Sequence, residues 1–210
     1  MIRHISFPLA ISLACLMLVS CATVKEQTDK EEPVSTEPAG WLAEKQKRQQ
    51  IKYWEIRGRL GLQTEKTGGS MDIIWKQAGE DFTIRLIAPL GSGSYMIQGE
   101  KDFAEIRFPD GEKQVVDNVD DIFVSALEVN LPASAIKDWV RGLPASALPV
   151  EHVDWNEQGL INRVKQSGWN VEMTRYSGSK ITLPHSIFVS REDNEDLDVR
   201  LILRQWLVDN

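Results

Sequence analysis

The chain has 210 residues, 42% of them hydrophobic, and 24 lysines and arginines against 31 aspartates and glutamates give it a net charge of -7. This size and composition indicate one globular domain with a small appendage, and the acidic balance argues against a nucleic-acid-binding surface. The two cysteines, Cys15 and Cys21, both lie in the first tenth of the chain, which excludes a disulfide scaffold and a multi-thiolate metal cluster.

The N-terminal segment, residues 1–20, has the pattern of a secretory signal. Arg3 and His4 precede an apolar run that is too short for a comfortable transmembrane helix. The run ends in Leu18-Val-Ser-Cys21, which resembles the bacterial lipobox. This resemblance implies that residues 1–20 are removed and that the new terminal cysteine is acylated. An ordinary signal with an incidental cysteine is the alternative.

The next segment, residues 21–40, is predicted to be a lipidated cysteine followed by a tether. It is rich in charge and proline and has almost no apolar side chains, so it has too little to bury to fold by itself. A flexible segment of this length spans roughly 25 Å. Lipoproteins that are retained in the inner membrane carry Asp directly after the acylated cysteine, whereas this chain has Ala22 at that position. The lipobox resemblance therefore implies that the protein is located at the periplasmic face of the outer membrane. The remaining residues, 41–210, form the predicted domain.

The first elements of this domain are a helix and a series of strands. Strong helix formers without glycine or proline predict a surface helix over residues 41–53. From Trp54 onward the apolar side chains recur at every second residue, which is typical of half-buried strands. Alternation predicts strands in residues 54–63, 70–76, 81–86, 105–108, 169–174 and 198–204. Turn signals between them fall at Gly68-Gly69, Gly79, Asp110-Gly111, Gly159, Ser177-Gly178 and Asp193-Asn194, which favours an antiparallel meander.

A helical stretch, residues 117–143, interrupts the strands. Phe123 belongs to a first short helix after an acidic start, and Pro132 begins a second helix that contains Trp139 and ends at Gly142. About nine to eleven strands with about three helices are too many for one open layer. The predicted fold is therefore mainly β with α: a half-open antiparallel β-barrel, lidded by the helices and enclosing an apolar interior.

The sequence offers little material for catalysis, so we predict no catalytic residues, no metal and no cofactor. His152 and His185 have no cysteine nearby and no zinc-binding spacing. An acyl-processing hydrolase would have to combine Ser92 or Ser94 with one of these histidines, and nothing in the sequence places them together.

A series of short motifs runs in order through the domain. They are Arg57-Gly58, Trp75-x-Gln77, Pro89-Leu90-Gly91, Asp110-Gly111, Pro132-x-x-x-Ile136-x-x-Trp139-x-x-Gly142-Leu143-Pro144, Gln166-x-Gly168-Trp169, Leu183-Pro184 and Leu201-x-Leu203-x-x-Trp206. Together with the lipobox, this order resembles the LolB family over essentially all of the chain after the tether. The resemblance implies an outer-membrane receptor that accepts lipoprotein acyl chains from a LolA-like periplasmic carrier and inserts them into the inner leaflet of the outer membrane.

The resemblance also implies two sites besides Cys21. A loop of Pro89, Leu90 and Gly91 would insert into the membrane through its exposed leucine. The acyl chains would lie in a cavity lined by Trp54, Ile56, Leu60, Ile73, Trp75, Ile84, Leu86, Met96, Trp139, Trp169, Met173 and Leu201. We expect a monomer. Because periodicity does not separate a cavity from an ordinary core, a structural or scaffold lipoprotein with a filled core and no lipid transfer is the alternative.

Overall fold

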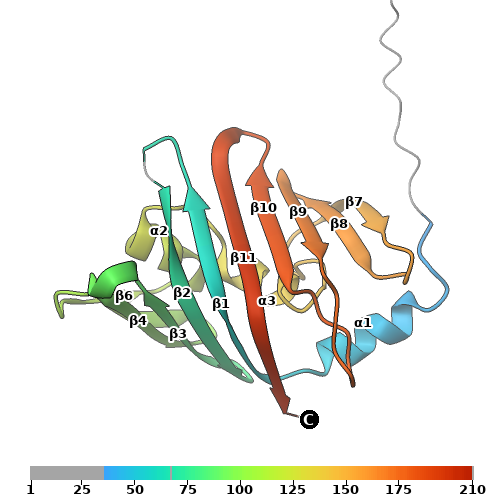
Figure 1. Ribbon diagram of the computed structural model, residues 1–210, viewed down its shortest axis with the longest axis horizontal. Helices are drawn as coiled ribbons and strands as arrows, with labels where there is room; N and C mark the ends of the chain where they lie inside the picture. Colours follow the sequence, from blue (N-terminus) through green and yellow to red (C-terminus); the bar gives the residue numbers. More distant parts are fainter. Residues whose placement is uncertain (1–35, 67, 210) are drawn as a thin grey trace, which may run out of the picture. The chain divides into compact units, whose positions relative to one another are not determined.

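An antiparallel sheet of eleven strands organises the computed structural model, which describes residues 36–209 except residue 67. The strand order is β6-β5-β4-β3-β2-β1-β11-β10-β9-β8-β7, so β1 and β11 lie near the centre and β6 and β7 form the two edges (Figure 1). The strands are β1 Tyr53–Gln63, β2 Gly68–Ala78, β3 Asp81–Ile87, β4 Ser94–Glu100, β5 Phe103–Arg107, β6 Lys113–Val116, β7 Val150–Trp155, β8 Ile161–Gln166, β9 Trp169–Thr174, β10 Ser186–Arg191 and β11 Asn194–Asp209.

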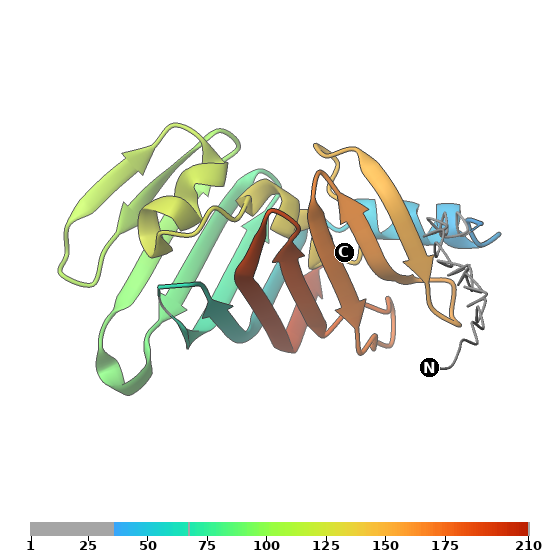
Figure 2. The same ribbon diagram turned by 90° about the horizontal axis from the view of Figure 1, so that it is seen from above.

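The helices are short, and two of them lie against the sheet. The α-helices are α1 Trp41–Gln49, α2 Ile122–Leu127 and α3 Ala133–Trp139, and the 3-10 turns are η1 Pro89–Gly91 and η2 Val119–Asp121. The sheet bends around α2 and α3, which occupy its concave side (Figure 2). Within residues 36–209, residue 67 aside, the helices are too short and too polar for any of them to cross a membrane.

The central strand β1 shows why this sequence forms a curved sheet. Its side chains alternate between buried and more exposed, with Ile56 and Leu60 buried and Arg57 and Arg59 exposed, as a strand with one wet face requires. The register with β11 shifts between Arg57 and Gly58. A Cβ at Gly58 would lie 2.2 Å from the backbone oxygen of Ile202, so only glycine allows the strands to meet at this bulge.

The predicted fold class is confirmed: the protein is mainly β, with a half-open antiparallel sheet, a strand number in the expected range and three α-helices. Two boundaries were wrong. The helix predicted over residues 41–53 ends at Gln49, because β1 begins at Tyr53. The glycines predicted as a turn, Gly68 and Gly69, instead begin β2. The predicted signal, Cys21 and residues 22–35 of the predicted tether lie outside the described residues.

Candidate functional site

The concave face of the sheet carries a continuous apolar surface. Because residues paired across strands share a face, the register aligns Ile56, Trp75, Ile84 and Ile97 in one row. Most of the residues that were predicted to line the interior lie on strands and are buried in this core. They are Trp54, Ile56, Leu60, Ile73, Trp75, Ile84, Leu86, Trp169, Met173 and Leu201. The alternation therefore identified the inward side of these strands.

Met96 is the exception, and its predicted inward orientation is wrong. The register pairs Met96 with Arg85 on β3 and with Arg107 on β5, and both arginines are exposed. Its neighbour Ile97 is fully buried and occupies the concave face instead. Residues 95–97 are all apolar, so the sequence alone does not tell which of them point to the concave face. The pairing of Met96 with two exposed arginines places it on the opposite face.

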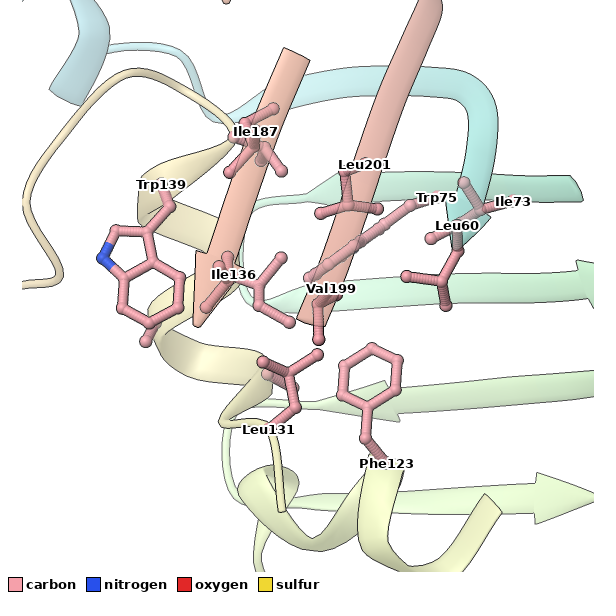
Figure 3. Close-up of a cluster of buried hydrophobic side chains, with 14 of the residues drawn as sticks. Leu60, Ile73, Trp75, Phe123, Leu131, Ile136, Trp139, Ile187, Val199 and Leu201 are labelled. Atoms are coloured by element: carbon pink, nitrogen blue, oxygen red, sulfur yellow. The ribbon is translucent and has the colours of Figure 1, made fainter. Parts of the chain in front are cut away.

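The helix layer fills the concave side of the sheet. Phe123 from α2, Leu131 from the segment after it, and Ile136 and Trp139 from α3 point toward the sheet (Figure 3). All four side chains are at most 2% exposed. Within the described residues the predicted interior is therefore a packed core, and its lining residues meet helix side chains. Any ligand could enter this interior only by displacing some of these side chains.

A fully buried glutamine fixes α3 in place. The side-chain oxygen of Gln166 accepts hydrogen bonds from Trp139 Nε1 at 3.1 Å and from the backbone N–H of Ala145 at 2.8 Å. Its amide nitrogen donates to the backbone oxygens of Ala145, at 3.0 Å, and Leu148, at 2.9 Å. Every polar atom of this buried side chain is satisfied, as burial of an amide requires. The sequence motif contained Gln166, but nothing in it indicated this role.

Other motifs also come together in space. Trp75 Nε1 donates to the side-chain oxygen of Gln77 at 3.1 Å, which explains their spacing. Trp206 Nε1 donates to the backbone oxygen of Pro184 at 3.1 Å, which joins two motifs that are separate in sequence. The rings of Trp54 and Trp75 lie 5.5 Å apart, and those of Trp54 and Trp206 lie 5.6 Å apart. Three tryptophans thus form one aromatic cluster with two of their indole nitrogens hydrogen-bonded.

A buried arginine, which the sequence did not indicate, secures α1. Arg48 is fully buried, pairs with Glu44 at 2.7 Å and donates to the backbone oxygen of Thr182 at 2.6 Å. The pKa of Glu44 is held below its usual value. The hydrogen bond from Lys47 contributes most to this lowering, and the hydrogen bond from Arg48 contributes next. Arg141, just beyond α3, donates to the backbone oxygen of Ile51 at 3.2 Å. These contacts join α1 to the end of α3.

The loop of Pro89, Leu90 and Gly91 forms η1 between β3 and β4. Leu90 is 103% exposed and has φ 57° and ψ 23°, in the left-handed region that disfavours a branched side chain. Two hydrogen bonds close the loop: Ser92 Oγ donates to the backbone oxygen of Pro89 at 2.8 Å, and the N–H of Ala88 donates to the backbone oxygen of Gly93 at 3.1 Å. A strained backbone therefore presents an apolar side chain to its surroundings.

The residues available for a hydrolase are spread across the sheet. Ser94 begins β4 and His152 lies on β7, at one edge of the sheet. His185 Nδ1 is hydrogen-bonded to the backbone oxygen of Leu203 at 2.8 Å. In the described part of the chain, no group of three or more His, Cys, Asp and Glu is placed to hold a metal ion.

The curved sheet with helices on its concave side is a fold that solved structures share. It superposes with a TM-score of 0.54 on a LolA superfamily protein from Nitrosomonas europaea, at 8% identity, covering 80% of this chain and 93% of that one. A DUF1329 family protein from Desulfovibrio piger superposes with a TM-score of 0.55, at 11% identity, covering 83% and 94%. At such low identity these likenesses establish the fold alone.

Sequence comparison identifies the family. The family model described as outer membrane lipoprotein LolB matches residues 52–206. The outer-membrane lipoprotein LolB of Nitrosococcus oceani is 27% identical over 93% of this chain and 94% of its own length. That of Alkalilimnicola ehrlichii is 29% identical over 94% and 95%. The chain belongs to the LolB family.

Proposed function

We propose that the protein is an outer-membrane receptor that accepts the acyl chains of lipoproteins from a LolA-like periplasmic carrier and inserts them into the inner leaflet of that membrane. A lipid on Cys21 would anchor it at the periplasmic face, as a monomer. Membership of the LolB family, whose relatives are named outer-membrane lipoproteins, supports the location. The observation that carries the insertion step is the full exposure of Leu90 on a loop closed by hydrogen bonds.

The energetics of Leu90 suit transient contact with a membrane. Burying a leucine side chain gains about 1.5–3 kcal/mol, which is too little to hold a protein at a bilayer by itself. The left-handed backbone at Leu90 costs on the order of 1 kcal/mol and keeps the side chain away from the protein's own core. The loop therefore contacts the membrane and leaves it readily, while stable anchoring falls to the lipid.

The packed interior is compatible with acyl binding because the helix side chains are replaceable. Displacing Phe123 and Leu131 costs about 1.5–3 kcal/mol each at most, whereas an acyl chain of about fifteen methylenes gains on the order of 12 kcal/mol on burial. The acyl chain also keeps its favourable free energy of burial when it moves into the bilayer, because the interior of the bilayer is equally apolar. Acyl transfer between such environments needs no nucleotide, provided that the receptor holds the chains no more tightly than the membrane does.

The filled concave face favours one second candidate, a structural or scaffold lipoprotein that transfers no lipid. In such a protein Phe123 and Leu131 would stay in place and no acyl chain would enter. The two candidates differ in whether the protein takes an acylated cargo from a carrier.

The test is a transfer assay with the full chain anchored in phospholipid vesicles and a lipoprotein supplied on its carrier. Leu90→Glu should still accept the cargo but should incorporate it roughly tenfold to a hundredfold less, because about 1.5–3 kcal/mol of membrane contact is lost. Leu42→Glu is the matched control, since Leu42 is 61% exposed on α1. We expect this control to behave as the unaltered protein does.

The outcomes separate the possibilities. Normal incorporation by Leu90→Glu would overturn the role of the loop. Failure of the unaltered protein to take cargo from the carrier at all would favour the scaffold.

A further inference from the structure

Gly69 is a glycine that neither the backbone nor the packing requires. It lies in β2, and its φ is outside the left-handed region. A Cβ built on it would meet no atom within 4 Å, whereas one at Gly99 would lie 2.6 Å from Phe82. Glycine weakens a strand, and within a strand it often marks a bulge, a tight bend, or the close approach of a ligand or of another backbone. The register of β1 with β2 runs through Gly69 without a shift, so Gly69 does not mark a bulge. The missing side chain at Gly69 leaves open space.

This space is part of an apolar groove on the concave side of the sheet. Gly69 pairs with Leu62. The next pair on the same face of the two strands, Leu60 with Met71, also lines the groove. Tyr95 lines it too, and the last turn of α2 closes it from the other side. The groove has a volume of about 460 Å³, within the range of small-ligand sites.

A second, polar pocket of about 470 Å³ lies on the other side of the α2 C-terminus. Glu128, the left-handed C-cap of α2 with φ 58°, lines both spaces. Most of the other residues that line the polar pocket are polar or charged, among them Asn130, Arg191 and Asp193. Apolar and polar binding spaces thus meet at one residue.

We propose that these two spaces form one amphipathic site for the acylated N-terminus of a lipoprotein, which deepens and rests on the proposed function. An acylated N-terminal cysteine joins hydrocarbon chains and a polar peptide at a single point, and this structure places an apolar and a polar space on either side of Glu128. An acyl chain occupies the groove at Gly69, and the peptide that follows the cysteine occupies the polar pocket.

The position of the groove connects this site to the membrane-contact loop. Pro89, the residue before Leu90, lines the groove. A chain that leaves the groove past Pro89 therefore emerges beside the exposed leucine. The site holds the cargo at the last stage before insertion.

A larger side chain at position 69 tests whether an acyl chain occupies the groove. The Cβ of Gly69→Leu would meet no atom within 4 Å, so the leucine side chain can project into the groove. Gly61→Leu is the matched control: Gly61 pairs with Ser70 and Arg200 on the opposite face, and its Cβ would make ordinary contact with Arg200 at 3.6 Å. In the vesicle transfer assay we expect Gly69→Leu to lower cargo transfer about tenfold and Gly61→Leu to leave it unchanged.

A labelling measurement keeps the proposal testable if Gly69→Leu impairs folding. Gly69→Cys, Asn130→Cys and Gly61→Cys, each in the full chain, are alkylated with a polar maleimide, and the labelled peptide is quantified by mass spectrometry. The probe is a synthetic peptide with a triacylated N-terminal cysteine. We expect it to slow labelling at position 69 and at position 130 about tenfold, but not at position 61. Triacylated cysteine without a peptide should protect position 69 alone.

The outcomes separate this site from the proposed function. Equal transfer by Gly69→Leu and the unaltered protein, or equal labelling with and without probe at position 69, overturns the site while the receptor function stands. Protection at position 130 by the cysteine without a peptide overturns the polar half. If the unaltered protein transfers no cargo, the proposed function fails and this site fails with it.

Discussion

The two helices on the concave face, α2 and α3, are held in different ways. α3 is fixed by hydrogen bonds: Trp139 binds Gln166, and Asp138 pairs with Arg141 and accepts the N–H of Ser146 at 2.7 Å. α2 is held by the packing of its buried side chains and by a hydrogen bond from Gln114 to Ser125 at 3.3 Å. Apolar packing is non-directional and can be exchanged for contact with a ligand, whereas satisfied buried polar groups resist displacement.

Under the proposed function, this difference indicates which helix would yield to an acyl chain. α2 carries Phe123 over the sheet and ends at Glu128, beside the apolar groove. Moving α2 exposes apolar surface that the incoming chain covers again. Moving α3 would leave the side chain of Gln166 and several backbone groups unpaired in the core. We therefore expect α2 and the segment after it to move while α3 remains a fixed wall.

The largest expected effect comes from removing the hydrogen bonds that fix α3. Gln166→Leu keeps the approximate volume but leaves Trp139 Nε1 and three backbone groups of Ala145 and Leu148 without their partner. Each unsatisfied buried group costs about 1–3 kcal/mol, so the free energy of unfolding should fall by about 4 kcal/mol or more. Chemical denaturation measures this, with Gln98→Leu, at an exposed position on β4, as the control. A loss below that of one ordinary hydrogen bond would mean that α3 is also held mainly by packing.

A smaller effect is expected where α1 supports the end of α3. Glu44→Gln replaces the charged partner of buried Arg48 with a neutral one and should lower the free energy of unfolding by about 1 kcal/mol at neutral pH. Because the pKa of Glu44 is lower in the folded protein than its ordinary value of 4.5, this contribution is fully present above pH 4.5. It is lost as the pH falls through the folded pKa. Unfolding curves of both proteins should therefore converge in acid, and a difference that persists there would contradict the assignment.

The smallest expected effect concerns α2. Glu128 caps this helix in the left-handed conformation, which glycine adopts without strain. Glu128→Gly should therefore raise the free energy of unfolding by about 0.5 kcal/mol, after the extra entropy of glycine in the unfolded chain is subtracted. Thermal denaturation monitored by circular dichroism provides the measurement. A clear destabilisation would show that the Glu128 side chain makes a contact worth more than the backbone strain.

The sequence predicted the fold better than the contacts within it. Alternation located the strands around Ile56, Trp75 and Ile84, because one wet and one buried face impose a period of two. It failed at Met96, where neighbouring apolar residues leave the phase open. Arg48 looked like a surface residue of a basic helix, since burial of an arginine depends on Glu44 and on the distant backbone of Thr182. No local pattern carries that information.

The candidate site was predicted in outline. The loop at Leu90 was predicted to be exposed through the family resemblance, and the structure places its side chain fully in solvent. The space beside Gly69 was missed, because two adjacent glycines resemble a turn and only the register of β1 with β2 assigns them to a strand. The filling of the interior by Phe123 and Leu131 depends on how distant segments pack, which periodicity does not determine.

The open strand order has a mechanical consequence. In a closed barrel the number of strands and their stagger fix the circumference, so the interior has one width. Here β6 and β7 end the sheet as separate edges, with nine strands between them. The curvature of such a sheet can relax or tighten by small changes in twist at each strand pair, with the backbone ladder intact. The width of the concave side can therefore change while the pairing between neighbouring strands is kept.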